Sequence, residues 1–298
     1  MSTGLDVQYI DGAMRPVSQG GERSWDRLSM YGEGCFDTLR AYQGGLLMAD
    51  KHLERIHRGL KHINIAVPGE LSSTELFYEL LKEFLQINKV QNEDVRIRIQ
   101  VWADDRTVGY HHHKNRKPRM RVEGSILNEE YVMDPQQPWK LRTSTVRKIP
   151  SQALPSDVKW TNGINYILAA AEAADHRADD ALMLDVRNNI SETTLANVFW
   201  KKGETIYTPS EKCDLLPGIT RALVIKGLQE DGFKVETGEY FRENLVASDF
   251  VWLTNSVREL IPVCQLDDES IPFDLNFWDI LSTRFQQTRN SLLHHVDI

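Results

Sequence analysis

The first residue whose position suggests chemistry is Lys159, which stands just before a helical pattern in the stretch DVKWTNGINYILAAAEAAD. Apolar residues recur there at helical spacing, so the pattern predicts a helix over 162–176. A lysine at a helix entrance is usually solvated, and in isolation this is the interpretation to prefer. If the fold instead buried Lys159 near other cations, its amine would give up its proton and could attack a carbonyl carbon.

Two further stretches carry groups that could do chemistry. Glu192, in SETTLANVFW, lies between a turn and a hairpin strand. It is either a surface glutamate or a carboxylate held against a ring nitrogen, which stays protonated only when an anion pairs with it. Gly218 precedes a helix with Thr220 in its first turn, and the unbonded N–H groups of such a turn attract anions. The alternative for Gly218 is ordinary helix punctuation, because no Gly-Lys-Ser/Thr of a P-loop follows.

Two more stretches place polar groups at the ends of elements. A predicted strand ends in Thr254, Asn255 and Ser256, whose hydroxyl and amide groups suit a phosphate or, equally, cap a turn. His52 and Arg55 share a face of another predicted helix. Without other information, that face is expected to be solvated.

Composition limits the classes of protein to which this chain can belong. It has 298 residues, of which 41% are hydrophobic and 26% charged, as in an ordinary globular protein of one or two domains. The formal net charge of −8 argues against a general nucleic-acid binder, and no apolar run is long enough for a membrane helix. Cys35, Cys213 and Cys264 stand far apart, so we expect neither a disulfide framework nor a metal site. With no signal-peptide pattern at the N-terminus, we expect a cytoplasmic protein.

The first part of the chain is predicted to form strands and two helices. The expected elements are a hairpin about Gln43-Gly44-Gly45, helices over 50–65 and 73–89, a strand over 95–103 and a long polar loop over 104–119. The composition turns polar and proline-containing at 128–140, which we interpret as an interdomain linker. Residues 1–127 would then form a small N-terminal α/β domain.

The second part alternates strands and helices. The expected elements are a strand over 140–148, the helix over 162–176, a strand over 180–186, a hairpin turning at Lys202-Gly203, a helix over 218–232, a strand over 249–257 and a helix over 275–293. Residues 141–298 would form a larger mixed α/β domain. The predicted fold class is therefore α+β, with two domains.

The motifs occur in the order found in one enzyme family. The chain resembles the class IV, fold type IV, pyridoxal-phosphate enzymes, which include branched-chain aminotransferases, D-amino-acid aminotransferases and aminodeoxychorismate lyases. The resemblance begins at DRLSMYGEGCFDTLRAYQGG and continues through HLERI, the Lys-x-x-Asn of VKWTN, SETTLANVF, YTP, LPGITR and ELIPV. It covers nearly the whole chain and implies a fold type IV architecture with pyridoxal 5'-phosphate as cofactor.

The resemblance also implies roles for the motif residues. Lys159 matches the lysine that forms the Schiff base with the cofactor, and Glu192 matches the carboxylate on the pyridine nitrogen. The remaining cofactor contacts are implied to come from Arg55, Thr193, Ile219, Thr220 and Ser256. Nearby cations and burial would lower the pKa of the lysine, which could then move a proton at the substrate's α carbon.

Substrate contacts are implied at a second set of positions. This set comprises Tyr31, Phe36, Thr38, Arg96, Arg98 and Val257. Arg96 and Arg98 are two apart on one predicted strand, so they share a face. They either clamp a carboxylate or lie on the solvent side, and the sequence does not favour one. The run His111-His112-His113 is expected to be a solvated loop rather than a metal site.

Three functions are open from the sequence. The first is an aminotransferase moving an amino group between a branched-chain or D-configured α-amino acid and a 2-oxo acid, and this one is favoured. The second is an aminodeoxychorismate lyase that releases pyruvate, for which Thr38 matches a threonine used by that enzyme. A non-catalytic protein on the same scaffold ranks last, because Lys159, Glu192 and Arg55 are all present. The resemblance further implies a homodimer.

Overall fold

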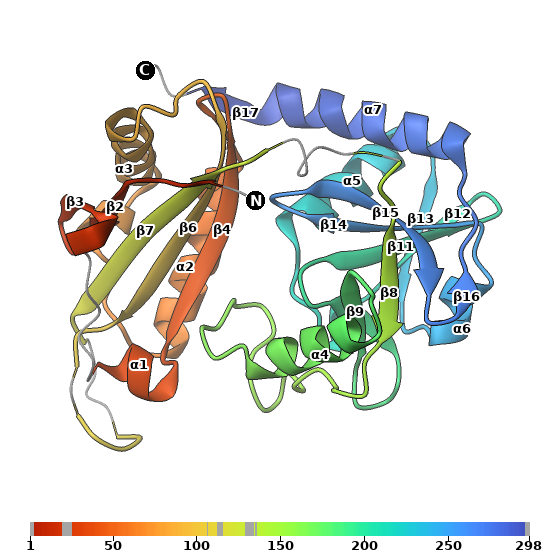
Figure 1. Cartoon of the computed structure of the whole chain (residues 1–298), viewed down its shortest axis with the longest axis horizontal. Coiled ribbons are helices and arrows are strands. Elements are labelled where there is room, and N and C mark those ends of the chain that lie inside the picture. The colour runs from red at the N-terminus through yellow and green to blue at the C-terminus, as the bar shows by residue number, and fades with distance from the viewer. Residues whose placement is uncertain are drawn as a thin grey trace. The chain divides into compact units, whose positions relative to one another are not determined.

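The computed structural model of the chain describes residues 3–19, 26–105, 107–111, 116–128, 134 and 136–295. The chain divides into two units, one of Met1–Tyr131, Val158–Asn162 and Leu292–Ile298, the other of Val132–Asp157 and Gly163–Ser291. Both combine helices and strands, as the sequence predicts (Figure 1). Within the expected linker at 128–140, residues 129–133 and 135 lie outside the described residues, and that boundary stays a prediction.

The first unit is built on an antiparallel sheet. Its strands are β1 (Thr3–Gly4), β2 (Val7–Ile10), β3 (Ala13–Pro16), β4 (Gly34–Tyr42), β5 (Gly45–Leu47), β6 (Asp94–Ala103), β7 (Pro118–Ile126) and β17 (Leu293–His295). The strand order is β17-β5-β4-β6-β7-β2-β3, with β1 paired to β7. The predicted hairpin between β4 and β5 is confirmed, because the two strands pair and Gln43 and Gly44 between them both have positive φ.

Helices cover one face of this sheet. They are α2 (Ala49–His62) and α3 (Thr74–Ile87), while α1 (Arg27–Tyr31), η1 (Val17–Gln19) and η2 (Gly69–Leu71) are short. Along β6, Val95, Ile97 and Ile99 are buried in one core with the apolar residues of α2 and α3. The residues between them point to the opposite face, which follows from the period of two of a strand. That opposite face is polar, and it carries several of the predicted site residues.

The second unit is a closed barrel with helices around it. Its strands are β8 (Trp139–Thr143), β9 (Asp180–Leu184), β10 (Ile190–Thr193), β11 (Asn197–Lys202), β12 (Thr205–Pro209), β13 (Lys234–Gly238), β14 (Phe250–Asn255), β15 (Glu259–Leu266) and β16 (Glu269–Ser270). Because β10 pairs with both β9 and β11, the ring β10-β9-β8-β15-β14-β11 closes on itself. Closure removes free edges within the ring, from which β12 and β13 extend beside β11, and leaves an interior filled by side chains.

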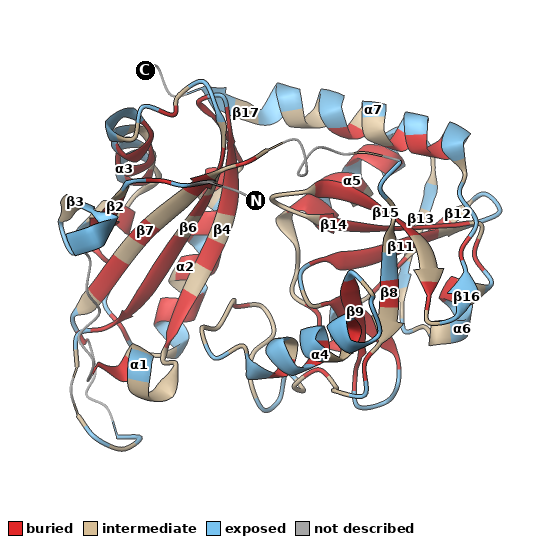
Figure 2. Ribbon diagram, viewed as in Figure 1, coloured by how far each residue is buried: buried red, intermediate tan, exposed pale blue. Residues whose placement is uncertain are grey.

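The helices of this unit bury one stripe each. They are α4 (Ile164–Asp175), η4 (Glu211–Cys213), α5 (Ile219–Glu230), α6 (Arg242–Val246) and α7 (Leu275–Leu292). Along α7, Phe277, Leu281 and Phe285 are buried at helical spacing, and the stripe alternates with exposed residues (Figure 2). Among the described residues, no helix combines the length and apolar character that crossing a membrane requires.

Some element boundaries differ from the sequence prediction. The helix expected from 162 begins at Ile164, because the preceding residues run in extended conformation beside β4. The loop expected over 104–119 ends where β7 starts, at Pro118. Within that loop, His112 and His113 lie outside the described residues, and His111 is exposed.

Candidate active site

Lys159 is held by backbone pairing to β4. The N–H of Phe36 donates to the Lys159 carbonyl (2.9 Å), and the N–H of Thr161 donates to the Gly34 carbonyl (3.1 Å). The half-buried side chain of Lys159 places Nζ 5.3 Å from the centre of the Phe36 ring. The lysine is therefore positioned by a strand-like segment before the helix, rather than by the helix itself.

Close packing of α2 supports this segment. A Cβ on Gly59 would come within 2.8 Å of Sγ of Cys35 and 2.9 Å of Cγ1 of Val158. Only glycine at this position lets α2 approach both β4 and the residue before Lys159. A larger residue would push the lysine-bearing segment away from the sheet.

The polar face of the sheet gathers four of the predicted substrate residues. Thr38 on β4 lies opposite Arg98 on β6, so Phe36, Thr38, Arg96 and Arg98 share the face away from α2. The prediction that the two arginines share a face is confirmed. The Arg98 guanidinium carbon lies over the Phe36 ring, 3.8 Å from its centre, a cation–π contact. Burial lowers the pKa of Arg98, and the charge of Glu123 only partly offsets that effect.

Arg55 is buried in a charge cluster rather than solvated. Its Nε and Nη2 each donate to Asp37 at 2.7 Å, and Nδ1 of His52 lies 2.9 Å from Oδ1 of Asp37. Asp37 is fully buried, on the α2 side of β4. Burial acts to raise the pKa of Asp37, but the charges of Arg55 and His52 outweigh it and the pKa falls well below its usual value. Asp37 therefore fixes the orientation of the Arg55 guanidinium.

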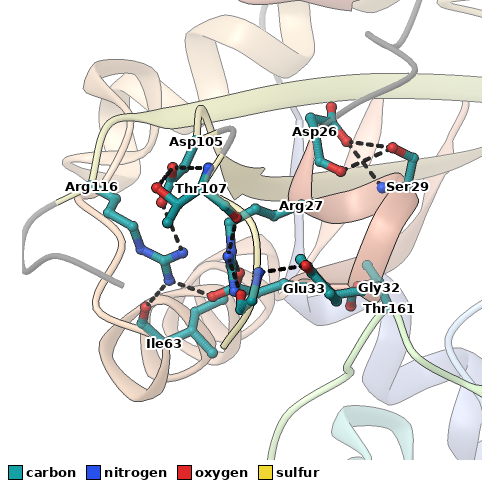
Figure 3. Close-up of polar contacts among 12 residues, drawn as sticks. Asp26, Arg27, Ser29, Gly32, Glu33, Ile63, Asp105, Thr107, Arg116 and Thr161 are labelled. Carbon is teal, nitrogen blue, oxygen red and sulfur yellow. Dashed lines mark hydrogen bonds and ion pairs between the residues drawn. The ribbon is translucent and has the colours of Figure 1, made fainter. Parts of the chain in front are cut away.

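Tyr31 is engaged by the loop that follows β6. Its hydroxyl accepts the N–H of Gly109 (2.7 Å), and Nη1 of Arg27 donates to the carbonyls of Thr107 and Gly109 in the same loop. Figure 3 shows Arg27 together with Arg116, both bonded to the carboxylate of Glu33. Burial acts to raise the pKa of Glu33, but the bonds from the two arginines outweigh it and the pKa falls. This network anchors the loop beside α1.

Glu192 is a buried carboxylate with every acceptor position used. Only 5% of the residue is exposed. Its Oε2 accepts from Nδ2 of Asn197 (3.2 Å) and from the N–H of Leu216 (3.1 Å). Its Oε1 accepts from Nζ of Lys148 and from the hydroxyl of Tyr166 (3.2 Å).

Lys148 and Tyr166 also bond to each other, which closes a triangle with Oε1 of Glu192. Burial acts to lower the pKa of Lys148, but the charge of Glu192 outweighs it and the pKa rises, so Lys148 stays a cation. Burial and the Glu192 charge raise the pKa of Tyr166 to about 12, so the phenol keeps its proton. The cluster holds an anion and a cation inside the barrel unit.

The first turn of α5 has the properties of an anion site. Its N-cap, Gly218, supplies no side-chain bond to the N–H groups of Ile219 and Thr220, and no acidic residue lies in that turn. A Cβ on Gly218 would fall 2.0 Å from Oδ1 of Asn197, so only glycine fits there. Nearby in the barrel, Thr254 pairs with Asn197 across β14 and β11.

Thr254 supports the same conclusion. The residue is 1% exposed, and its hydroxyl has no hydrogen-bond partner within the part of the chain that the structure describes. Antiparallel pairing places its side chain on the same face as that of Asn197. A buried hydroxyl with no partner is costly unless a ligand satisfies it.

The remaining predicted residues lie at the end of a strand or in a turn of the barrel unit. Thr193 is buried, and its hydroxyl bonds the main chain of Ala196, closing the turn after β10. Ser256 and Val257 lie in the turn after β14, where the Asn255 side chain accepts the N–H of Val257 (2.9 Å). Across the described ranges, no group of three metal-ligating side chains is brought together.

Comparison with known proteins identifies the family. The model of the amino-transferase class IV family matches residues 34–266. The chain belongs to the class IV aminotransferases. This range includes the lysine segment, the α2 cluster, Glu192 and the first turn of α5.

Individual class IV relatives agree in overall extent. The chain is 29% identical to an aminodeoxychorismate lyase of Bacillus subtilis (87% of this chain, 86% of that protein). It is 28% identical to a putative branched-chain-amino-acid aminotransferase of Methanocaldococcus jannaschii (88% of each). Solved structures agree in fold. The branched-chain aminotransferase of Thermoproteus uzoniensis with norvaline has a TM-score of 0.88 at 21% identity, and the match covers 99% of both chains. A branched-chain amino acid aminotransferase complexed with N-(5'-phosphopyridoxyl)-L-glutamate has a TM-score of 0.89 at 23% identity, and the match covers 98% of this chain and 99% of that one. The fold is thus that of a class IV aminotransferase.

Several functional candidates escape sequence reasoning. Asp37, Lys148, Asn197 and Tyr166 bond the predicted residues Arg55 and Glu192. Asp37 belongs to the FDT motif, and its place in this motif is the only sequence feature that could have marked it as functional. Lys148 is 44 positions from Glu192 and is the last residue of the strand predicted over 140–148, with nothing in its neighbours to mark it.

Proposed function

We propose that the chain is an aminotransferase that uses pyridoxal 5'-phosphate to move an amino group between a branched-chain or D-configured α-amino acid and a 2-oxo acid. The observation that carries this proposal is Glu192. A buried carboxylate that the main chain of Leu216 and the amide of Asn197 fix in place suits a protonated ring nitrogen. In a class IV aminotransferase, this is the group expected to keep the cofactor's ring cationic.

The chain's other groups fit the rest of the cofactor. The first turn of α5, with Ile219 and Thr220, suits the phosphate, and the unsatisfied hydroxyl of Thr254 is available to bond a ligand. Arg55, oriented by Asp37, is a fixed cation of the kind that binds phosphate. Arg55, Ser256 and Thr193 stay proposed cofactor contacts by resemblance.

Lys159 is proposed as the amine that carries the cofactor. Pyridoxal phosphate supplies an aldehyde that condenses with amines and a ring that withdraws electrons from the substrate's α carbon. With the cofactor bound, the amine of Lys159 would act as the base that removes the proton from the substrate's α carbon and as the acid that gives a proton back. The backbone pairing of its segment to β4 keeps the amine in place through both steps.

Substrate recognition is assigned to the polar face of the first unit. Arg98, whose guanidinium lies over the Phe36 ring, and Arg96 on the same face of β6 present guanidinium groups that suit a carboxylate. Tyr31 and Val257 remain proposed substrate contacts.

A homodimer and a cytoplasmic location also stay predictions. Size-exclusion chromatography with light scattering tests whether the protein is a dimer.

Thr38 supports a second candidate function, the aminodeoxychorismate lyase. Its side chain lies on the same sheet face as Phe36 and Arg98, where it can contact a substrate bound there. The Bacillus subtilis relative bears that name at 29% identity, close to the 28% of the branched-chain relative, so identity does not separate the two.

The test is a half-reaction without any 2-oxo acid. Protein loaded with pyridoxal phosphate is mixed in turn with L-leucine, D-alanine and L-glutamate, and the 2-oxo acid formed is measured by mass spectrometry. One equivalent of 2-oxo acid per site from any of them supports the aminotransferase and names its substrate class. No product from all three, with pyruvate released from aminodeoxychorismate, establishes the lyase instead.

A further inference from the structure

The carboxylate of Glu192 has no acceptor position left for a ligand. A carboxylate offers about four lone-pair sites, and here Lys148, Tyr166, Asn197 and Leu216 occupy two on each oxygen. A protonated ring nitrogen can bond Glu192 only by replacing one of these donors. The donor that is replaced should be the one that loses the fewest favourable interactions on leaving Glu192.

The two donors on Oε2 are anchored. Leu216 donates through its main chain, and Nδ2 of Asn197 also bonds the Leu216 carbonyl at 2.9 Å. Moving either would disturb the loop that leads into α5. The exchange therefore takes place at Oε1.

Lys148 and Tyr166 on Oε1 differ in the cost of leaving. Lys148 is 4% exposed, and separating a buried cation from its only ion-pair partner in the described chain is strongly unfavourable. Tyr166 accepts a hydrogen bond from Lys148 and donates the longer bond, 3.2 Å, to Glu192. If the hydroxyl turns away from Glu192, it keeps its bond from Lys148 and loses only the bond that it donates.

We propose that Tyr166 is the exchangeable donor: its hydroxyl occupies on Oε1 of Glu192 the position that the cofactor's ring nitrogen takes, and it stays with Lys148 after the exchange. Lys148 is then a positioning residue that stays paired with Glu192 both before and after the cofactor binds. This inference rests on the proposed role of Glu192. It adds that, without the cofactor, the hydroxyl of Tyr166 occupies this position on Glu192. The cofactor must displace the hydroxyl, and this competition raises the dissociation constant of the cofactor.

The test is the dissociation constant of pyridoxal phosphate for cofactor-free Tyr166→Phe, measured by fluorescence titration of the full chain. Phenylalanine keeps the ring and removes the competing donor, so we expect binding roughly threefold to tenfold tighter than in the wild type, the range for the net contribution of one ordinary hydrogen bond. The melting temperature of the cofactor-free variant should fall, because Glu192 loses a donor. Tyr207→Phe is the matched control, since Tyr207 packs on Trp200 in the same unit and its dissociation constant should not change.

The possible outcomes separate this inference from the proposed function. An unchanged constant in Tyr166→Phe shows that the hydroxyl does not compete, and weaker binding shows that Tyr166 bonds the loaded cofactor; either result overturns the inference while leaving the function intact. If the wild type itself does not bind pyridoxal phosphate, the proposed function fails and the inference fails with it.

Discussion

Glu192 shows at the scale of single residues how much of the site lies outside the motifs. The motif SETT locates the carboxylate, but its charge is balanced by Lys148 and its direction is fixed by Asn197 and Leu216. Partners that come from other strands and loops leave no local pattern in the sequence. The sequence therefore predicts which residue would do the chemistry and misses the residues that would make the chemistry possible.

Replacing Glu192 should affect both rate and stability. Glu192→Gln removes the anion that we propose for the ring nitrogen and leaves the buried ammonium of Lys148 without its counter-charge. We expect a large fall in turnover and a loss of about 3–5 kcal/mol in the free energy of unfolding. Urea denaturation and single-turnover kinetics measure the two effects.

A second change separates the two effects. In the double variant Glu192→Gln with Lys148→Met, the buried charge is gone, so most of the lost stability should return while turnover stays low. A double variant as unstable as the single one would show that the ion pair is not what Glu192 contributes to the fold.

At the scale of elements, β4 and α2 are joined by a buried ion pair as well as by apolar packing. Asp37 on β4 holds Arg55 and His52 on α2, and all three are almost completely buried. The sequence predicts both elements from their periodicity, and β6 shows its alternation plainly. It does not predict that Arg55 is buried, because an arginine on a helix is more often solvated and the pairing with the buried Asp37, which reverses that preference, is not visible in the local pattern.

Asp37→Asn should weaken the joint between β4 and α2. Removing one partner of a buried pair costs about 3–5 kcal/mol in the free energy of unfolding, which urea denaturation at neutral pH measures. Asp94→Asn is a control, because that carboxylate pairs with Arg40 near the strand end and is partly exposed. A loss as small as in the control would contradict the account of the cluster.

The same pair predicts a pH dependence. The pKa of Asp37 is lower in the folded than in the unfolded chain, where it is about 3.9. Its contribution is therefore complete above the unfolded value and is lost as pH falls toward the folded value. Between pH of about 5 and the acid transition, the wild type should lose more stability than Asp37→Asn, and parallel curves would rule this out.

Gly218 decides whether a phosphate can reach the N–H groups in the first turn of α5. Gly218→Ala places a methyl group on Asn197, so we expect the dissociation constant of pyridoxal phosphate to rise at least about tenfold. Gly227→Ala, on the same helix with its nearest neighbour atoms at 3.6 Å, should bind normally and gain slightly in stability. Equal affinities in the two variants would exclude this turn as the phosphate site.

At the scale of the whole molecule, the sequence predicts the fold class and most hairpins but not the closure of the barrel. The glycine predicts the turn at Lys202-Gly203, and Gly203 indeed has positive φ. The ring closes through pairs such as Glu192 with Asn197 and Ile190 with Leu184. Which strands pair across the ring depends on packing rather than on local pattern, so periodicity alone cannot give it.

The reactivity of the three cysteine thiols tests the packing of both units. Burial raises the pKa of Cys35 to about 12 and that of Cys213 to about 11, whereas Cys264 is partly exposed. Thiol reactivity follows the thiolate and its access, so a disulfide reagent should label Cys264 first in the native protein and all three only after denaturation. Cys264→Ser should abolish the native reaction, and rapid native labelling of Cys35 would contradict the described packing of α2.

The most direct test of the central claim is to locate the cofactor on the chain. Borohydride reduction of the protein loaded with pyridoxal phosphate, followed by proteolysis and mass spectrometry, identifies the amine that carries it. The account predicts a pyridoxyl group on Lys159, and none in Lys159→Ala. A pyridoxyl group on Lys148 or on another lysine, with Lys159 unmodified, would contradict it.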